Sequence, residues 1–314
     1  MMKRKNGVLD FFSTLWRTKK VSFFCMVILI LFLLVAIFAN FLAPQKMVDG
    51  VLESSLIDSC KAPSLEHPLG TDAMGRDLLS YMIYGARTSV ILGVTCTIIQ
   101  TVISVIIGVA SATIGGKFDL LLQRFIDAFQ CIPPMLIMLI LMSILGAGIP
   151  QMIIVLSVPA GIGGSRMIRS AAFSVKDSGY CKMSKTLGGG NVWRMIKHVV
   201  PNVMPLILMN LASSLGAVIM MEATLDYLGF GVNVNTPSWG YILTSQGRNK
   251  MYSAPWIGMA PGLAITIMVF AAAMFGDGVR DVRDPRLKGG MGSFSVEKIR
   301  KFTRKYLKKH AAVN

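Results

Sequence analysis

The stretch VSFFCMVILILFLLVAIFANFLA at residues 21–43 is apolar almost throughout, with Asn40 as its one strongly polar interruption. About 20 apolar residues are enough for a helix to cross the hydrocarbon core of a bilayer. The whole chain of 314 residues is 53% hydrophobic and only 15% charged, with a mean hydropathy of +0.59. A soluble domain carries charge on about a quarter of its residues. The sequence therefore predicts a membrane protein whose first transmembrane helix is residues 21–43.

The same stretch could belong to a secretory signal peptide, because the basic residues Lys3, Arg4 and Lys5 precede it. The apolar core of a signal peptide is shorter, about 7–15 residues, and ends at a small-x-small cleavage site. No such site precedes Pro44. We therefore expect the stretch to remain in the protein as a membrane helix.

Further apolar stretches follow at Thr88 to Ile114, Phe125 to Gly146, Met152 to Gly164, Pro201 to Met221 and Trp256 to Phe275. Together with the first, they predict an all-α polytopic membrane protein with six transmembrane helices. The fourth stretch is the shortest. The glycines at 161, 163 and 164 are expected to weaken the end of its helix, although the residues that follow could extend it toward Ala172.

Lysine and arginine gather in only some of the connecting segments. They are frequent in residues 1–20, in the loop at 166–198 and in the tail at 288–314, whereas residues 44–87 hold more acids than bases. Cations resist translocation and stay on the cytoplasmic side. This distribution predicts that both termini are cytoplasmic and that 44–87 is an external loop. Residues 88–287 then form a five-helix core that carries the cytoplasmic loop.

The net charge of +16 also raises the possibility of nucleic-acid binding. A protein that binds single strands interleaves its cations with aromatic side chains on one face, but here the cations flank apolar spans, so no nucleic-acid partner is expected. Residues 293–310 alternate apolar side chains with many lysines. That pattern fits a helix lying on anionic membrane lipid, or equally a solvated tail.

The sequence carries no loop for nucleotide phosphates. Such a loop reads G-x-x-x-x-G-K-[ST], in which the lysine and the hydroxyl hold the phosphates and the metal. The nearest approach is Gly116-Lys117, where Ser111 replaces the first glycine and Phe118 replaces the hydroxyl residue. The chain is therefore not expected to hydrolyse nucleotides by itself.

Catalytic and metal-binding side chains are scarce in the predicted spans. His67, His198 and His310 all fall outside them, so neither an intramembrane protease nor a metal site is predicted. The ionisable residues within the spans are Glu222 and Asp127. An ion-coupled secondary transporter, which uses such groups at mid-membrane, is the alternative class of transporter.

Four separated parts of the sequence carry a family resemblance. They are HPLGTDAMGRDLLS at 67–80, YCKMSKTLG at 180–188 with WRMIKHVVPN at 193–202, EATLDYLGFG at 222–231 with PSWG at 237–240, and GDGVRDVRDPRL at 276–287. Together they resemble the dipeptide, oligopeptide and nickel branch of bacterial ABC import permeases, in particular the second of its two permease subunits. The resemblance implies a type I ABC importer permease-like bundle in the bacterial cytoplasmic (inner) membrane.

The resemblance also implies roles for three groups of residues. An external loop signature is formed by His67, Gly70, Asp72, Gly75, Arg76 and Asp77. Coupling to an ATPase subunit falls to Tyr180, Lys182, Ser184, Leu187, Gly188, Arg194, His198 and Pro201. The mouth of the translocation path falls to Glu222, Asp226 and Trp239.

Within the coupling segment, Gly188 is expected to end one helix in a left-handed conformation and Pro201 to lie in the first turn of the next. The family usually has Glu-Ala-Ala where this chain has Lys-Met-Ser, so Lys182 is expected to meet an acidic ATPase residue. The family also has a small hydroxyl residue in place of Asp226. We expect this extra carboxylate to attract cationic peptides at the outer mouth.

The resemblance implies that a homologous permease subunit, two ATPase subunits and an extracytoplasmic substrate-binding protein are partners. The chain itself would hold no cofactor, while ATP and Mg²⁺ would bind to the ATPase subunits. Dipeptides or oligopeptides are the expected substrates. Nickel or a metal chelate is the alternative.

Overall fold

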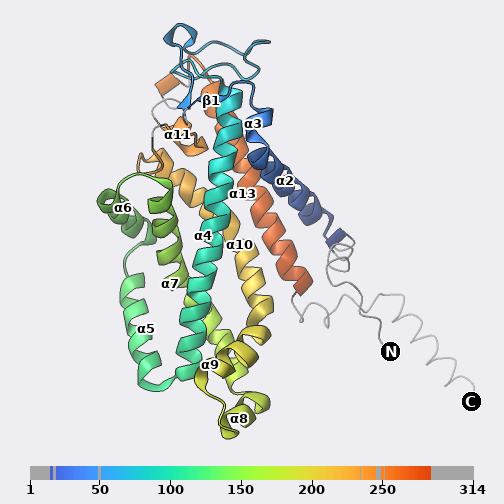
Figure 1. Ribbon diagram of the computed structural model, residues 1–314, viewed down its shortest axis with the longest axis vertical. Helices are drawn as coiled ribbons and strands as arrows, with labels where there is room; N and C mark the ends of the chain where they lie inside the picture. Colours follow the sequence, from blue (N-terminus) through green and yellow to red (C-terminus); the bar gives the residue numbers. More distant parts are fainter. Residues whose placement is uncertain are drawn as a thin grey trace, which may run out of the picture.

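The longest helix, α4 (Leu78–Ile114), runs through the middle of a bundle of long helices (Figure 1). The computed structural model describes residues 15–16, 19–48, 51–233, 235–244, 249–250 and 252–283. The other long helices are α2 (Lys20–Ile37), α7 (Ile149–Lys176), α10 (Val200–Tyr227) and α13 (Trp256–Arg283). Residues 1–14 of the N-terminal flank and the predicted amphipathic tail lie outside the described residues.

Five helices of the described chain are long and apolar enough to cross a membrane, or six if one bent pair counts as a single span. This confirms the predicted all-α membrane protein. The first span is α2 followed, after Phe38, by the short helix α3 (Ala39–Leu42). Most helices extend beyond their predicted boundaries, because they continue past the apolar residues from which they were predicted.

The predicted span at Phe125 to Gly146 is not one straight helix. It consists of α5 (Gly116–Gln130) and α6 (Pro134–Leu145), which are bent by 83° at the break between them. Pro133 disfavours helical geometry at the residue before it, and Pro134 suits the first turn of a new helix. The prediction of an unbroken helix was wrong because it ran through this pair of prolines.

The span predicted at Met152 to Gly164 is longer than its apolar stretch, because the helix extends past Ala172, as the sequence allowed. The helix α7 continues to Lys176, and Gly161 and Gly164 lie in its middle. These glycines permit close packing, since a Cβ at Gly161 would lie 2.7 Å from the Cβ of Ile103 on α4. Close contact between helices is a common use of small residues in membrane proteins.

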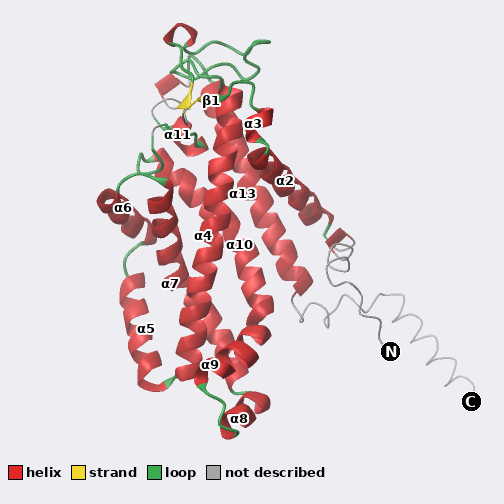
Figure 2. Cartoon of the chain, viewed as in Figure 1, coloured by secondary structure: helices red, strands yellow, loops and turns green. Residues whose placement is uncertain are grey.

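The two ends of the bundle differ in structure (Figure 2). At one end, which we call the outer-loop end, residues 43–77 form loops, a turn of 3-10 helix at Leu56–Asp58 (η1) and a two-stranded antiparallel sheet. Its strands β1 (Met47–Val48) and β2 (Val51–Leu52) pair Met47 with Leu52. The short helix α11 (Trp239–Leu243) lies at the same end.

At the opposite end, which we call the α8 end, the chain leaves α7 and forms α8 (Gly179–Thr186) and α9 (Asn191–Arg194). One π-helical turn, η2 (Met195–Val199), then leads into α10. The predicted loop at 166–198 is thus largely helical.

The described chain enters and leaves the bundle on the same side. Lys19, just before α2, pairs its Nζ with Oδ2 of Asp281 near the end of α13, at 2.9 Å. The hydrogen bond and charge of Asp281 raise the pKa of Lys19. An even number of crossings requires this arrangement, which agrees with the prediction that both termini share one side.

A close contact between α13 and α10 lies at Gly276. A Cβ at Gly262 would meet open space, whereas a Cβ at Gly276 would lie 2.6 Å from the Cα of Ser213. The close contact therefore lies nearer the end of α13.

Candidate functional site

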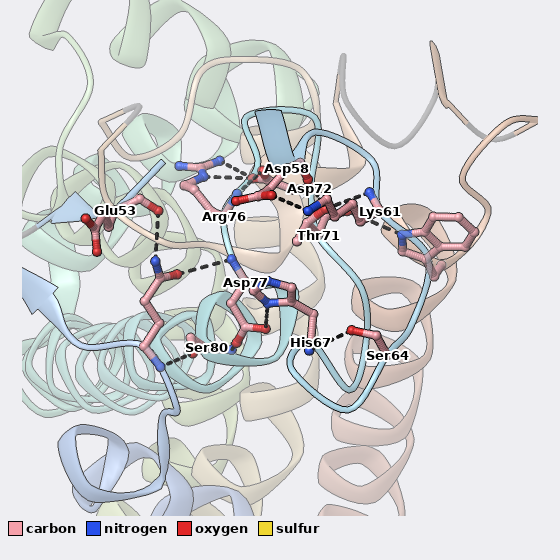
Figure 3. A network of polar contacts seen from close by, with 12 residues as sticks. Glu53, Asp58, Lys61, Ser64, His67, Thr71, Asp72, Arg76, Asp77 and Ser80 are labelled. Atoms are coloured by element: carbon pink, nitrogen blue, oxygen red, sulfur yellow. Dashed lines mark hydrogen bonds and ion pairs between the residues drawn. The ribbon is translucent and has the colours of Figure 1, made fainter. Parts of the chain in front are cut away.

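The external loop signature folds around one buried carboxylate (Figure 3). Oδ1 of Asp72 accepts hydrogen bonds from the backbone N–H groups of Met74 and Arg76, at 2.8 and 2.9 Å. Oδ2 accepts from Nε of Arg76 at 2.7 Å, and the guanidinium also stacks over the ring of Tyr81. Both side chains of this ion pair are almost fully buried. Because a buried charge needs such partners, Asp72 and Arg76 fix the shape of the loop.

Asp77 is the N-cap of α4. Its Oδ2 accepts hydrogen bonds from the backbone N–H of Ser80, at 2.8 Å, and from the Ser80 hydroxyl, at 2.6 Å. Its Oδ1 lies 3.0 Å from Nδ1 of His67. The signature thus starts the central helix ten residues before the apolar stretch that predicted it.

Two signature glycines are needed by the turns. Gly70 and Gly75 have φ values of 78° and 74°, in the left-handed region that favours glycine. A Cβ at Gly75 would also overlap the backbone oxygen of Ser55. On the loop surface, a hydrogen bond from Lys61 lowers the pKa of Asp58. The signature residues therefore have a structural role, because they form the turns that lead into the N-terminus of α4.

The turn after α8 has the geometry that the sequence predicted. Gly188 has a φ of 84°, and its N–H donates to the carbonyl of Lys185 at 3.1 Å. The N–H of Gly189 donates to the carbonyl of Ser184 at 2.9 Å. This pair of bonds is the Schellman arrangement, which satisfies the last carbonyls of a helix. The predicted left-handed helix end is confirmed.

This segment exposes several large apolar side chains among its lysines. We define the α8–α9 patch as the exposed side chains of Met183, Leu187, Val192, Trp193 and Ile196. Isolated exposed apolar residues are normal on a protein, whereas a contiguous group marks a surface for interaction.

The charged and aromatic members of the predicted coupling segment lie beside the patch. Lys182 is exposed and pairs with Asp177 of its own chain at 3.7 Å, so an acidic neighbour is already present. The rings of Tyr180 and His198 are 6.1 Å apart. Arg194 is buried and donates a hydrogen bond to the side chain of Asn191.

Pro201 lies in the first turn of α10, as predicted, directly after the π-helical turn η2. Proline cannot donate the hydrogen bond to the residue four positions back, and its ring crowds that carbonyl. A π turn widens the helix at this point. The turn holds His198 and joins the α8 end to the membrane span.

The predicted mouth residues are buried in the described chain. Asp226 accepts hydrogen bonds from the backbone N–H of Val232, at 2.9 Å, and from the hydroxyl of Ser238. Glu222, one turn earlier, lies 3.2 Å from the hydroxyl of Ser89 on α4. The two side chains are each only 1% exposed, so neither presents an open charge to an entering substrate.

Trp239 closes the same region from α11. Its Nε1 donates to the carbonyl of Met82 at 2.9 Å, and its ring packs edge-on against Phe32 of α2. A Cβ at Gly85 would lie 2.7 Å from this indole. These contacts attach α11 to α4 and α2.

A cavity of about 240 Å³ lies among α4, α6, α7 and α10. Its polar lining consists of Gln100, Ser104, Asn210 and Ser214, and its apolar lining includes Met138 and Met221. The sequence interpretation missed this site because it searched the spans only for ionisable groups. Uncharged amide side chains in the middle of a span were the available signal.

Residues 100–289, more than half of the chain, match the family of binding-protein-dependent transport system inner membrane components. The chain belongs to this family. It is therefore a multi-pass transport component of the bacterial inner membrane, and a subunit for transport instead of catalysis.

Curated members of this permease family match over most of their length. The chain is 33% identical over 273 residues to the oligopeptide transport system permease protein OppC of Bacillus subtilis, covering 87% of this chain and 88% of that protein. It is 31% identical over 288 residues to the dipeptide transport system permease protein DppC of the same organism, covering 90% and 88%. The family resemblance of the sequence is confirmed.

A solved structure supports the fold of the permease. A chain of the MetNI methionine ABC transporter, in inward-facing conformations, superposes with a TM-score of 0.52 at 17% identity. The match covers 64% of this chain and 96% of that chain. The long helices thus adopt the arrangement of an ABC importer permease.

Proposed function

We propose that this chain is a permease subunit of an ATP-driven importer of dipeptides or oligopeptides. The observation that carries the proposal is the match, at 31–33% identity and over nearly the whole chain, to permeases named for oligopeptides and dipeptides. These names favour peptides over the nickel or metal-chelate alternative. The family match also argues against an ion-coupled carrier, because members of this family belong to binding-protein-dependent transport systems.

The α8–α9 patch is the surface on which an ATPase subunit would dock. It is apolar and exposed, and the left-handed turn at Gly188 fixes the direction of α8 relative to α9. The ATPase pair would bind ATP and Mg²⁺, and its closure would push on α8. The π turn η2 and Pro201 then connect that movement to α10.

A homologous permease would complete the path. The central cavity reaches the surface of this chain, since Ala217 is exposed and Asn210, Ser214 and Met221 are half-buried. A second permease placed on this face would enclose the cavity between the two subunits. Two ATPase subunits would serve the pair.

An extracytoplasmic binding protein would deliver the peptide at the outer-loop end. Leu56, Ile57 and Leu65 are exposed there, each by more than four-fifths. The segment that carries Leu56 and Ile57 is attached to the signature by the N–H of Cys60, which donates to the carbonyl of Asp72 at 3.0 Å.

The test is reconstitution of this chain with its permease, ATPase and binding-protein partners in liposomes, followed by uptake of labelled tri-alanine. We expect uptake only with ATP inside and all partners present, and no ATP turnover by the purified chain alone. ATP turnover by the chain alone, or uptake of a nickel chelate in preference to tri-alanine, would refute the proposed function.

A further inference from the structure

The central cavity lies about halfway along three long helices. Gln100 is near the middle of α4, and Asn210 is near the middle of the continuous helix at Asn191–Tyr227. Gly164 is near the middle of α7. Such a level corresponds to the interior of the bilayer, where polar side chains are costly and usually functional.

Two apolar clusters border the cavity along the bundle. Toward the outer-loop end, Leu92, Val155 and Val218 pack together. Toward the α8 end, Val109 and Ile168 belong to a second cluster. The polar residues between the two clusters are therefore a local interruption of an apolar core, and their presence needs an explanation other than packing.

The amide side chains in this interruption are available to a ligand. Gln100 is only 7% exposed and Asn210 is half-buried, yet the described residues give neither side-chain amide a hydrogen-bond partner. Ser104, by contrast, already donates to the carbonyl of Gly161 at 2.8 Å. Neither amide is among the side-chain atoms that the described chain buries without a partner, so both are open to the cavity, where water or a ligand can pair with them.

The cavity stays open because α7 carries a glycine at its wall. A Cβ at Gly164 would lie 2.6 Å from the hydroxyl oxygen of Ser104 and 4.0 Å from Nδ2 of Asn210. The volume, about 240 Å³, is just below the roughly 300 Å³ at which pockets begin to enclose drug-sized ligands. It can receive a short segment of an extended molecule at a time.

The lining selects one kind of ligand chemistry. It contains no carboxylate, imidazole or thiol, which are the side chains that supply most protein ligands to metal ions. A side-chain amide offers one carbonyl acceptor and an NH₂ donor, which are the same two functions that a peptide bond presents. An amide can therefore pair with a peptide main chain regardless of the side chains that the peptide carries.

We propose that Gln100 and Asn210 form a subsite that hydrogen-bonds the main chain of a peptide as it crosses the membrane. This inference rests on the proposed function and adds the residues and the recognised group. The subsite is sequence-independent, because it contacts only what all peptides share.

The experiment uses the complete reconstituted transporter with Asn210→Leu, Gln100→Leu and the conservative Asn210→Gln. Asn40→Leu is the control, because it removes the same amide from an exposed position of α3, away from the cavity. The two substrates are labelled tri-alanine and its analogue in which both peptide bonds are N-methylated. Uptake per ATP hydrolysed is measured with the binding protein saturated.

We expect each leucine variant to lower tri-alanine uptake about 3- to 10-fold, the effect of losing one hydrogen bond. Uptake of the methylated analogue should change little, so the preference for tri-alanine should shrink. Asn210→Gln keeps an amide and should retain the preference for tri-alanine. Asn40→Leu should behave as wild type, and all variants should keep their ATPase partners.

Equal losses for both substrates, or wild-type uptake by both leucine variants, would overturn the subsite while leaving the proposed function standing. The absence of tri-alanine uptake by the wild-type complex would instead remove the proposed function and the subsite with it.

Discussion

Asp226 and Glu222 lie one helical turn apart on α10, and both carboxyl groups are enclosed by protein. Asp226 receives hydrogen bonds from the segment that follows the helix, at Val232 and Ser238. A Cβ at Gly231 would overlap its carboxyl group. These contacts make Asp226 an anchor for the loop that leads to Trp239, and not the open carboxylate that the sequence suggested.

Asp226→Asn should therefore destabilise the protein by about 1–3 kcal/mol, because an amide nitrogen would face one of the two donors that the carboxylate now accepts. Thermal unfolding in detergent measures this loss. Uptake of lysine-containing and neutral peptides should fall equally. Glu66→Gln, at an exposed acid of the outer loop, is the control and should leave stability within about 0.5 kcal/mol. A selective loss of cationic peptides in Asp226→Asn would restore the charge-attraction hypothesis.

Sequence reasoning could not have placed these carboxylates. A glutamate and an aspartate at the end of an apolar stretch look the same whether they face water or a neighbouring helix. The difference depends on Ser89 and Ser238, which are distant in sequence. Gly188, in contrast, was predictable, because a left-handed helix end depends only on local residues.

The elements at the α8 end combine a short helix, a left-handed turn and a π turn. A Cβ at Gly188 would meet no atom within 4 Å, so a side chain there would be strained only by its backbone conformation. Gly190 also faces open space, but its φ is −64°, which any residue adopts. Substitutions at the two glycines therefore distinguish the effect of a strained backbone turn, at Gly188, from the effect of a larger side chain alone, at Gly190.

Gly188→Val should cost on the order of 1–2 kcal/mol in the turn and redirect α8. We expect the complex to lose ATPase subunits during purification, or to hydrolyse ATP without uptake. Gly190→Val should behave as wild type, and binding of the substrate-delivery protein should persist in both. Equal behaviour of the two variants in ATPase retention, hydrolysis and transport would mean that the turn is only a connector.

At the scale of the elements, hydropathy located every span but misjudged one of them and left the length of another open. The bend between α5 and α6 follows from Pro133 and Pro134, which the sequence displays, so it was available to local reasoning. The continuation of α7 past Gly164 was only one of two alternatives that the sequence left open. Intrinsic propensity disfavours glycine in helices, and here packing against α4 outweighs it.

The whole molecule presents two chemically different ends. Which end faces the cytoplasm is a prediction from the distribution of lysine and arginine. Cysteine labelling tests it, but Cys181 is buried and would react poorly from either side. Leu65 and Leu187 are better positions, since both are highly exposed at opposite ends of the bundle.

In a background without the five native cysteines, Leu65→Cys should react with a membrane-impermeant maleimide in intact cells. Leu187→Cys should react only after permeabilisation. Each variant serves as the control for the other, and the opposite pattern would invert the assigned topology.

The length of α4 has a mechanical consequence. Its 37 residues span about 55 Å at 1.5 Å per residue, whereas the hydrocarbon core is about 30 Å thick. Nearly half of the helix therefore projects beyond the hydrocarbon. Its first turn is held by Asp77 in the outer signature, and its last carbonyls include that of Ala112, which accepts a hydrogen bond from Lys176 of α7. A stiff rod that is attached to a different element at each end and pivots between them works as a lever, so a small tilt at the α8 end reappears, reversed in direction, at the outer-loop end.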